Sequence, residues 1–194
     1  MKEIVYQELL DDEIDVCREL CNELMLFQKS KATINTEQFD LMNYDTRMKV
    51  SYQNALASNV VVAYDGTKIV GYVFSTVEQL NEKPTSYPSW AKISDPTTVK
   101  GFYPDFLEYP AKVGCLNNIY IKDEYRDHKI GGELLKRGLQ WLESFNDIKY
   151  FFVFISNGNY NALDFYQRHG FIYTHDVFEG FIYSAYLENK NYQK

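Results

Sequence analysis

The sequence feature that most constrains the fold is an unbroken apolar run at residues 150–155, Tyr-Phe-Phe-Val-Phe-Ile. An apolar run without polar alternation predicts a central strand that is covered on both faces. The run follows a helical pattern at 131–144, which itself follows a strand-like segment at 115–121. A strand, a helix and a strand in this order predict a parallel pair of strands joined by a right-handed crossover.

The segments around this unit predict further strands and a short helix. Asp65-Gly66 separates two β-rich apolar runs, residues 59–64 and 69–77, and this spacing is typical of a hairpin. A short strand is expected at 2–8, a short helix at 159–169, and two last strands near 171–173 and 180–187.

Two helices are predicted ahead of the hairpin. Asp11 or Asp12 can cap the first helix, and Thr36 is a suitable N-cap for the second. The first helix has apolar residues at helical spacing: Ile14, Cys17, Leu20, Cys21 and Leu24. The second has the buried stripe Leu41, Met48, Tyr52, Ala55 and Leu56. The acidic outer face of the first helix fits a solvated surface better than a patch that attracts amines.

Residues 79–112 interrupt the regular pattern. All five prolines of the chain lie in this stretch, together with Trp90, Phe102, Tyr103, Phe106 and Tyr109. Such a segment is too apolar for a free linker. Two interpretations are equally open: the rings form a lid or wall over a cleft or against a partner subunit, or they anchor an insertion to the core.

Length and charge limit the class of protein. A chain of 194 residues with 45% hydrophobic residues fits one domain, residues 1–194. The formal net charge of −7 argues against nucleic-acid binding, because no long-range field favours a polyphosphate. Cys17, Cys21 and Cys115 form no fully paired disulfide framework, and we expect buried thiols rather than metal ligands. Since the chain has no apolar signal core and no apolar run of about 20 residues, we expect a cytoplasmic protein without a membrane partner.

The most informative passage joins the segment at 115–121 to the helix at 131–144. Its loop carries Arg126, His128 and Lys129, and the helix starts at Gly131-Gly132. A helix start offers unpaired backbone N–H groups and the positive end of the helix dipole, and glycines let a ligand approach those amides. The passage therefore predicts an anion site suited to a pyrophosphate, and a tight strand-to-helix turn is the structural alternative.

This passage resembles the GNAT superfamily of acetyl-CoA-dependent N-acetyltransferases. The family motif Q/R-x-x-G-x-G/A is matched at its first and last positions by Arg126-Asp-His-Lys-Ile-Gly131. Lys129 stands where the family usually has Gly, and the cradle is expected to survive if Lys129 has ordinary φ and ψ angles. A second family motif, N-x-x-A-x-x-F-Y-x-x-x-G-F, is present at residues 159–171, with the buried strand between the two motifs.

The resemblance implies both a fold and a site. The implied fold class is α/β (α+β), with a mixed, mostly antiparallel central sheet, one parallel strand pair joined by a crossover helix, and helices on both faces. The main chain of Ile119, Tyr120 and Ile121 would pair with the pantetheine arm of acetyl-CoA. The pyrophosphate would be held beside Arg126 by the backbone amides of Asp127, His128, Lys129, Ile130, Gly131 and Gly132. Asn159 would hydrogen-bond the arm from the other side, and Tyr166 would protonate the departing thiolate.

The implied reaction is direct transfer of the acetyl group to a small or peptidic primary amine, with acetyl-CoA as cosubstrate and no metal. An un-ionised tyrosine suits the role of proton donor, because its reference pKa of about 10 lies above the value of about 8.5 for a thiol. Without the second motif, Tyr166 would be a core residue and Asn159 a helix cap. Cys115 lies within an apolar strand, so packing is favoured over a nucleophilic role.

Some alternatives stay open from the sequence. The base that takes the amine proton is Glu78, Asp105, Glu108 or a water chain. A non-catalytic acyl-CoA-binding or regulatory module is the competing function. Exposed aromatic residues in the insertion at 79–112 would also suit a homodimer interface.

Overall fold

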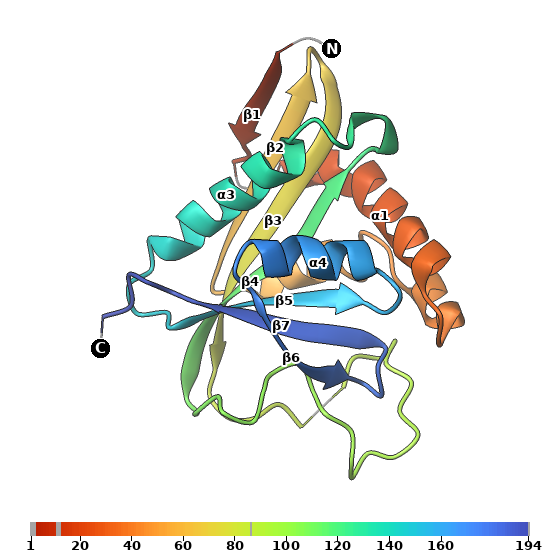
Figure 1. The fold of residues 1–194 in the computed structure, drawn as a ribbon, viewed down its shortest axis with the longest axis vertical. Coiled ribbons are helices and arrows are strands. Elements are labelled where there is room, and N and C mark those ends of the chain that lie inside the picture. The colour runs from red at the N-terminus through yellow and green to blue at the C-terminus, as the bar shows by residue number, and fades with distance from the viewer. Residues whose placement is uncertain (1–2, 11–12, 86, 194) are drawn as a thin grey trace.

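The computed structural model describes residues 3–10, 13–85 and 87–193, which fold around one seven-stranded sheet (Figure 1). In their order across the sheet, the strands are β1 (Ile4–Glu8), β2 (Ala57–Asp65), β3 (Lys68–Leu80), β4 (Ala111–Ile121), β5 (Tyr150–Ser156), β7 (Ile182–Glu188) and β6 (Ile172–Val177). Neighbouring strands are antiparallel except β4 and β5, which run parallel. The predicted mixed, mostly antiparallel sheet with one parallel pair is confirmed.

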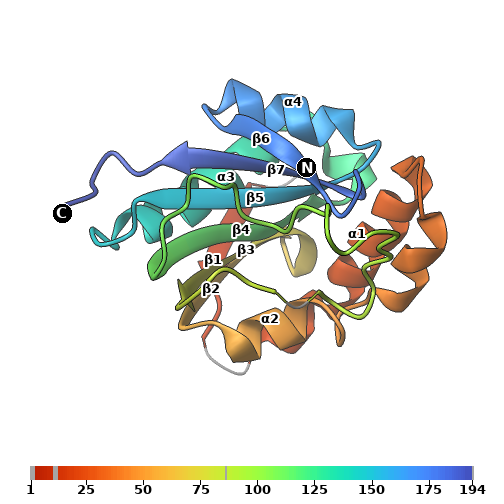
Figure 2. The same cartoon turned by 90° about the horizontal axis from the view of Figure 1, so that it is seen from below.

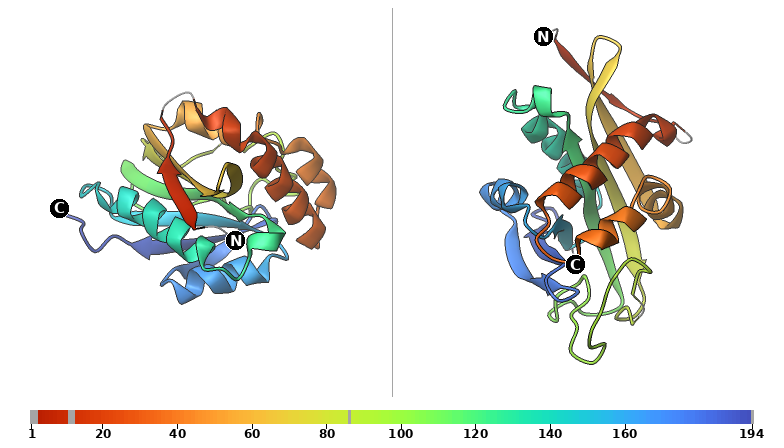
Figure 3. Two further views of the ribbon diagram at one scale, coloured as in Figure 1. Left: turned by 90° about the horizontal axis from the view of Figure 1, so that it is seen from above. Right: turned by 90° about the vertical axis from the view of Figure 1, so that its right-hand side faces the viewer.

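Helices cover both faces of this sheet, as predicted (Figure 2, Figure 3). They are α1 (Arg18–Lys31), α2 (Met48–Asn54), α3 (Ile130–Glu143) and α4 (Tyr160–Arg168). The crossover helix α3 and α4 pack on one face, around a core that contains Val73, Leu134 and Phe151. Helices α1 and α2 pack on the other face with Phe74. Within the described ranges, no helix combines the length and the apolarity that crossing a membrane requires.

The apolar pattern explains the elements that frame the cleft described below. Helix α3 buries residues at helical spacing on the side that meets the sheet: Ile130, Leu134, Leu135, Gly138 and Leu142. Strand β5 buries three consecutive residues, Phe151 to Val153, as expected for a strand with helices on both sides. Strands β2 and β3 form the predicted hairpin, in which Gly66 takes a φ of 64°.

The second predicted helix is wrong in its extent. Residues Thr36–Leu41 form a 3₁₀ helix, and α2 begins only at Met48, so Thr36 caps no long helix. The side chain of Asn43 explains the break, because its Oδ1 accepts hydrogen bonds from the N–H groups of Asp45 and Thr46. These local bonds give the backbone an alternative to helix.

The two predicted apolar stripes differ in how far they are buried. Leu41 and Leu56, assigned to the buried stripe of the second helix, are 53% and 61% exposed. In the first helix the predicted stripe is buried, and the helix starts as a 3₁₀ turn, Ile14–Cys17, that continues into α1. The proposed capping residues Asp11 and Asp12 lie outside the described residues.

The insertion forms a long loop, residues 81–110, between β3 and β4. Its rings pack against the chain's own core: the ring of Trp90 lies 5.8 Å from that of Phe178, and the ring of Phe102 lies 4.8 Å from that of Phe154. Trp90 and Tyr103 are buried. These contacts agree with the interpretation that the rings anchor the insertion to the core.

A polar hub at Asn157 and Gly158 joins the end of α1 to the start of α4. Asn157 is buried, and its Oδ1 accepts from the N–H groups of Thr33 at 2.7 Å and Ile34 at 3.1 Å. Its Nδ2 donates to the carbonyl of Phe181 at 3.1 Å. The hub fixes the position of α4 relative to α1, and both helices line the cleft described next.

Candidate functional site

A cleft of about 490 Å³ brings together most of the residues that the sequence singled out. Its walls are the end of β4, the loop and first turn of α3, one face of α4 and part of α1. Of the predicted site residues, the following line it: Ile119, Tyr120, Ile121, Arg126, Asp127, Lys129, Ile130, Gly131, Gly132, Asn159 and Tyr166. His128 is exposed and is not among the lining residues.

The cleft exists because β4 and β5 separate. Their parallel pairing covers only Gly114–Leu116 and Phe151–Val153. Beyond it, β4 continues to Ile121 and pairs with β3 alone within the described chain. One row of backbone N–H and C=O groups of Ile119–Ile121 is therefore left for an extended ligand to bind, as at any unpaired strand edge.

A bulge marks the point where β4 leaves β5. Phe74 of β3 pairs with Asn118, whereas the next residue, Ser75, pairs with Leu116, so Asn117 is extra. A β-bulge bends its strand and changes the direction of its side chains. The Nδ2 of Asn117 donates to the Oγ1 of Thr76, which turns this side chain toward β3.

The start of α3 lies where the sequence predicts an anion cradle. The first helical N–H to find a carbonyl is that of Glu133, which donates to Lys129 at 3.2 Å. The N–H groups of Ile130, Gly131 and Gly132 precede it and have no intrahelical partner. These amides lie in the same cleft as the open edge of β4.

The expectation of ordinary backbone angles at Lys129 is wrong. Lys129 has a φ of 63° and a ψ of 5°, and Asp127 also has a φ of 63°. The chain must turn sharply from the 3₁₀ turn Asp123–Tyr125 into α3, and that turn requires the left-handed region. A side chain in this region costs about 1–2 kcal/mol, which explains why the family usually has Gly at this position. The amides at the start of α3 are nevertheless in place.

The positive charge beside the cradle is partly neutralised within the protein. Arg126 forms an ion pair with Asp123, and its guanidinium lies 4.3 Å from the ring centre of Phe27 on α1. Lys129 also lines the cleft, and no ion pair involves it among the described residues. His128 Nδ1 contacts the carbonyl of Arg126 at 2.7 Å, so the histidine contributes to the shape of the loop.

Tyr166 occupies the face of α4 that points into the cleft. Its ring packs edge-on against Phe171, with 5.5 Å between ring centres, and only 8% of the residue is exposed. Burial raises the pKa of Tyr166 above its ordinary value of 10. The hydroxyl therefore keeps its proton at neutral pH, as a proton donor must.

Asn159 has a structural role. Its side chain caps α4 by accepting the N–H of Ala162 at 3.3 Å, which is the helix-cap interpretation weighed from the sequence. The residue also lines the cleft, so the two interpretations are compatible.

The three candidate carboxylates have different surroundings. Glu78, on β3, accepts a hydrogen bond from the hydroxyl of Tyr103 at 2.9 Å and one from Thr76 at 3.4 Å. Thr76 in turn contacts Asn117 at the bulge. Asp105 forms an exposed ion pair with Lys83, and Glu108 is exposed on the insertion. Glu78 is thus the candidate that a hydrogen-bond chain connects to β4.

Sequence reasoning missed several residues that line the cleft. They are Leu24 and Phe27 of α1, Tyr125, and Asn161, Ala162, Phe165 and Arg168 of α4. Leu24 and Phe27 are three residues apart, so they share one helix face, but nothing in the sequence indicates that this face extends beyond the core. The sequence could have indicated Asn161, Phe165 and Arg168, because they follow the cap at Asn159 at helical spacing.

Burial raises the pKa values of the three cysteine thiols and so lowers their reactivity. It raises the pKa of Cys17 to about 12, and it also raises the pKa values of Cys21 and Cys115. Since the thiolate is the reactive form, we expect the folded protein to react with a disulfide reagent at pH 8 far more slowly than the protein in guanidinium, which should titrate all three cysteines. A thiol that reacted at the unfolded rate in the native protein would contradict this burial.

The sequence profile of the acetyltransferase (GNAT) family matches residues 18–171, so the chain belongs to this family. No curated protein sequence matches the chain. Among the described residues, no group of three or more His, Cys, Asp or Glu side chains is arranged to hold a metal ion.

Solved structures show the same fold. The PaiA N-acetyltransferase from Thermoplasma acidophilum, in complex with coenzyme A, is 16% identical with a TM-score of 0.63, covering 96% of this chain and 99% of that one. NAA60 from Arabidopsis thaliana, in complex with a bisubstrate analogue, is 10% identical with a TM-score of 0.59 over 97% and 99%. The ribosomal-protein-S18-alanine N-acetyltransferase from Escherichia coli is 11% identical with a TM-score of 0.55 over 96% and 94%.

Proposed function

We propose that this protein transfers an acetyl group from acetyl-CoA to a primary amine. The observation that carries the proposal is the meeting of two unpaired backbone features in one cleft: the free edge of Ile119–Ile121 and the amides at Ile130–Gly132. An extended amide-bearing arm needs the first, and a pyrophosphate needs the second. Membership of the acetyltransferase family agrees with this combination.

The cleft suits coenzyme A in shape as well as in chemistry. A Cβ added to Gly132 would meet no atom within 4 Å, so the space next to this amide is open. The side chains of Lys129 and Arg168 also line the cleft and supply positive charge. When bound there, acetyl-CoA supplies the activated thioester.

Two side chains are proposed to move protons. Tyr166 holds a proton on its hydroxyl in the cleft and would give it to the departing sulfur. Glu78 would take the proton of the amine, and Thr76 would hold its carboxylate by donating to it while accepting from Asn117. The backbone N–H groups of the free β4 edge would stabilise negative charge on the acetyl oxygen.

The competing function is an acyl-CoA-binding or regulatory module that uses the same cleft without chemistry. Binding of the carrier does not separate the two functions, because both need the cradle. Turnover does separate them. A thiol-release assay with acetyl-CoA across a panel of primary amines is the direct test, and the absence of any amine-dependent release would favour the module.

We predict that Gly132→Ala weakens coenzyme A binding without destabilising the fold. The new methyl group meets no protein atom, and alanine favours helix by up to about 1 kcal/mol over glycine. If the ligand occupies that space, its affinity should fall about 10-fold, seen as a smaller rise of the thermal midpoint at equal coenzyme A concentration.

Gly101→Ala is the matched control for this variant. A Cβ at Gly101 also meets no atom within 4 Å, and Gly101 lies in the insertion rather than the cleft. We expect it to respond to coenzyme A as the wild type does. If coenzyme A raised the thermal midpoint equally in the wild type, Gly132→Ala and Gly101→Ala, it would bind elsewhere.

A further inference from the structure

Arg47, the residue before α2, makes no ion pair with any residue that the structure describes. In the described part of the chain, Arg18, Arg126 and Arg137 each pair with a carboxylate, whereas no ion pair involves Arg47. Its Nε is shut off from solvent and has no hydrogen-bond partner. A buried polar group without a partner is costly, so it points to a missing ligand.

The guanidinium is held flat and partly desolvated. Its central carbon lies 4.8 Å from the ring centre of Trp90, which belongs to the insertion. Burial lowers the pKa of Arg47, and an arginine stays charged all the same. Residue 47 as a whole keeps intermediate exposure, and Nε is the one guanidinium nitrogen named among the buried atoms without a partner in the described chain. A planar guanidinium presented in this way matches a carboxylate, which it can bind with two parallel hydrogen bonds.

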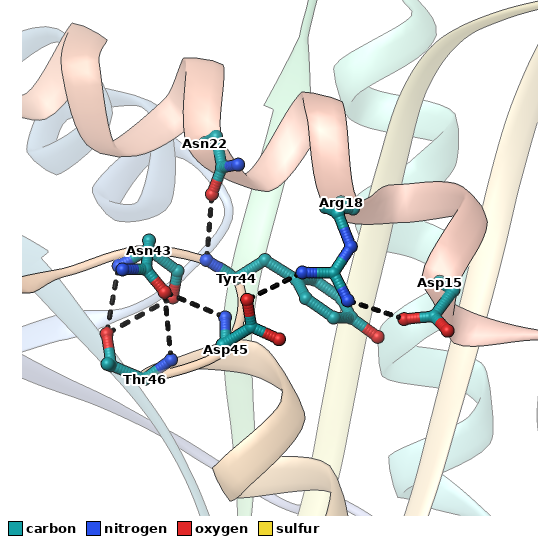
Figure 4. A network of polar contacts seen from close by, with 7 residues as sticks. All are labelled: Asp15, Arg18, Asn22, Asn43, Tyr44, Asp45 and Thr46. Atoms are coloured by element: carbon teal, nitrogen blue, oxygen red, sulfur yellow. Dashed lines mark hydrogen bonds and ion pairs between the residues drawn. The ribbon is translucent and has the colours of Figure 1, made fainter.

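Hydrogen bonds hold the turn at residues 43–46, directly ahead of Arg47 (Figure 4). Asn22 of α1 accepts the N–H of Tyr44 at 2.8 Å, and Asn43 accepts the N–H of Asp45 at 2.9 Å. The N–H of Arg47 itself donates to the carbonyl of Asn43 at 2.9 Å. These bonds attach the turn to α1, so Arg47 starts from a rigid backbone.

Arg47 is not among the residues that line the cleft, but it lies beside α1, which forms one wall of the cleft. Burial raises the pKa of Cys21, and the positive charge of Arg47 lowers it in part, so the two groups are neighbours. Cys21 lies one helical turn before Leu24, which lines the cleft.

We propose that Arg47 binds a carboxylate of the acceptor, so that the substrate is an amine that also carries an acid group. The inference rests on the proposed acetyl transfer, and it narrows the acceptor class. The carboxylate would provide the partner that Arg47 lacks, in a chain whose net charge of −7 otherwise disfavours anions. The same chemistry has two sources: the α-carboxylate of a free amino acid, or an acidic side chain near a peptide N-terminus.

The test compares matched acceptors. Free amino acids are assayed against their carboxamides, and peptides beginning with Glu against peptides beginning with Gln. We expect the wild type to prefer the acid in one of the two arms, and Arg47→Gln to reduce that acid-to-amide ratio of kcat/KM about 10-fold or more. Arg47→Lys keeps the positive charge but loses the planar guanidinium that makes two parallel hydrogen bonds, so its acid-to-amide ratio should be intermediate.

Arg137→Gln is the matched control, because Arg137 also lies over a ring, that of Tyr6, but already pairs with Glu133. Its acid-to-amide ratio should equal that of the wild type. A wild type without acid preference in both arms would overturn the proposal. A ratio that does not change in Arg47→Gln would overturn it equally.

A second readout needs no turnover. The chain has two tryptophans, Trp90 and Trp141. In Trp141→Phe, the tryptophan fluorescence therefore comes from Trp90, the ring beside Arg47. With coenzyme A present, we expect the acids to change the fluorescence of Trp90 saturably and the amides to leave it unchanged. In Arg47→Gln the acids should no longer change it. Equal responses to acid and amide would reject the role of Arg47. Failure of the proposed acetyl transfer would instead appear as no midpoint shift with coenzyme A and no thiol release with any amine.

Discussion

Replacing Gly158 with alanine is expected to leave little folded protein. Gly158 has a φ of 74°, and a Cβ built there would lie 1.9 Å from the carbonyl oxygen of Lys31 at the end of α1. That oxygen belongs to the backbone, so no side chain can rotate away. The end of α1 and the start of α4 would have to separate, which would also break the hydrogen bonds that Asn157 makes to Thr33 and Ile34.

The expected cost combines two effects that a control can separate. A left-handed alanine costs about 1–2 kcal/mol, and loss of the buried Asn157 hydrogen bonds adds about 1–3 kcal/mol for each polar group left unpaired. Gly170 is the matched control, because its φ of 91° is equally strained for alanine, while its Cβ would lie an ordinary 3.4 Å from Leu187.

Urea unfolding followed by circular dichroism measures the difference between these two variants. We expect Gly170→Ala to unfold cooperatively with a free energy of unfolding lower by about 1–2 kcal/mol. We expect Gly158→Ala to lose at least about 4 kcal/mol, which for many domains is most of the stability. If the two variants had the same midpoint, the close approach of α1 and α4 at Gly158 would be refuted.

The elements around the cleft were predictable because their signals are local. Apolar periodicity defines α3, the unalternating run 150–155 defines β5, and Asp65-Gly66 defines the hairpin. The position of the cradle also follows from local sequence, since it depends on where α3 begins. These are the cases in which propensity, spacing and tertiary packing agree.

The remaining features depend on contacts between distant segments. The break before α2 depends on Asn43 bonding to its own turn and on Asn22 of α1 bonding to that turn. The left-handed Lys129 reflects the path that the chain must take between β4 and α3, which overrides the preference of the side chain. Arg47 gives no signal in the sequence, because an arginine before a helix is ordinary. The structure alone shows that its Nε is buried and that no described residue partners it.

Replacing Tyr166 with phenylalanine should separate binding from chemistry. The change removes one oxygen atom and keeps the ring contacts with Phe165 and Phe171, so we expect the fold and coenzyme A binding to be nearly unchanged. If the hydroxyl protonates the departing thiolate, kcat should fall about 100-fold or more, within the range for the loss of a general acid. Thiol release under saturating acetyl-CoA measures it.

Tyr173→Phe is the matched control for the loss of a hydroxyl. Its oxygen donates to Asp176 at 2.8 Å on β6, away from the cleft, so we expect kcat to equal that of the wild type. Glu78→Gln in the same assay tests the proposed base, with loss of turnover expected at unchanged coenzyme A binding. Turnover that survives in Tyr166→Phe would remove this hydroxyl from the reaction.

The pH dependence of kcat, measured for the wild type and for Tyr166→Phe, adds a further check. Burial raises the pKa of Tyr166 above its ordinary value of 10, so the protonated form persists at every pH below about 10. An acid with a raised pKa loses its function only as the pH rises through that pKa, so we expect no decline of kcat between about pH 7 and pH 9 from this group. A fall of kcat in that range that was absent from Tyr166→Phe would mean that the pKa of Tyr166 is lowered rather than raised, and would contradict the desolvation of its hydroxyl against Phe171.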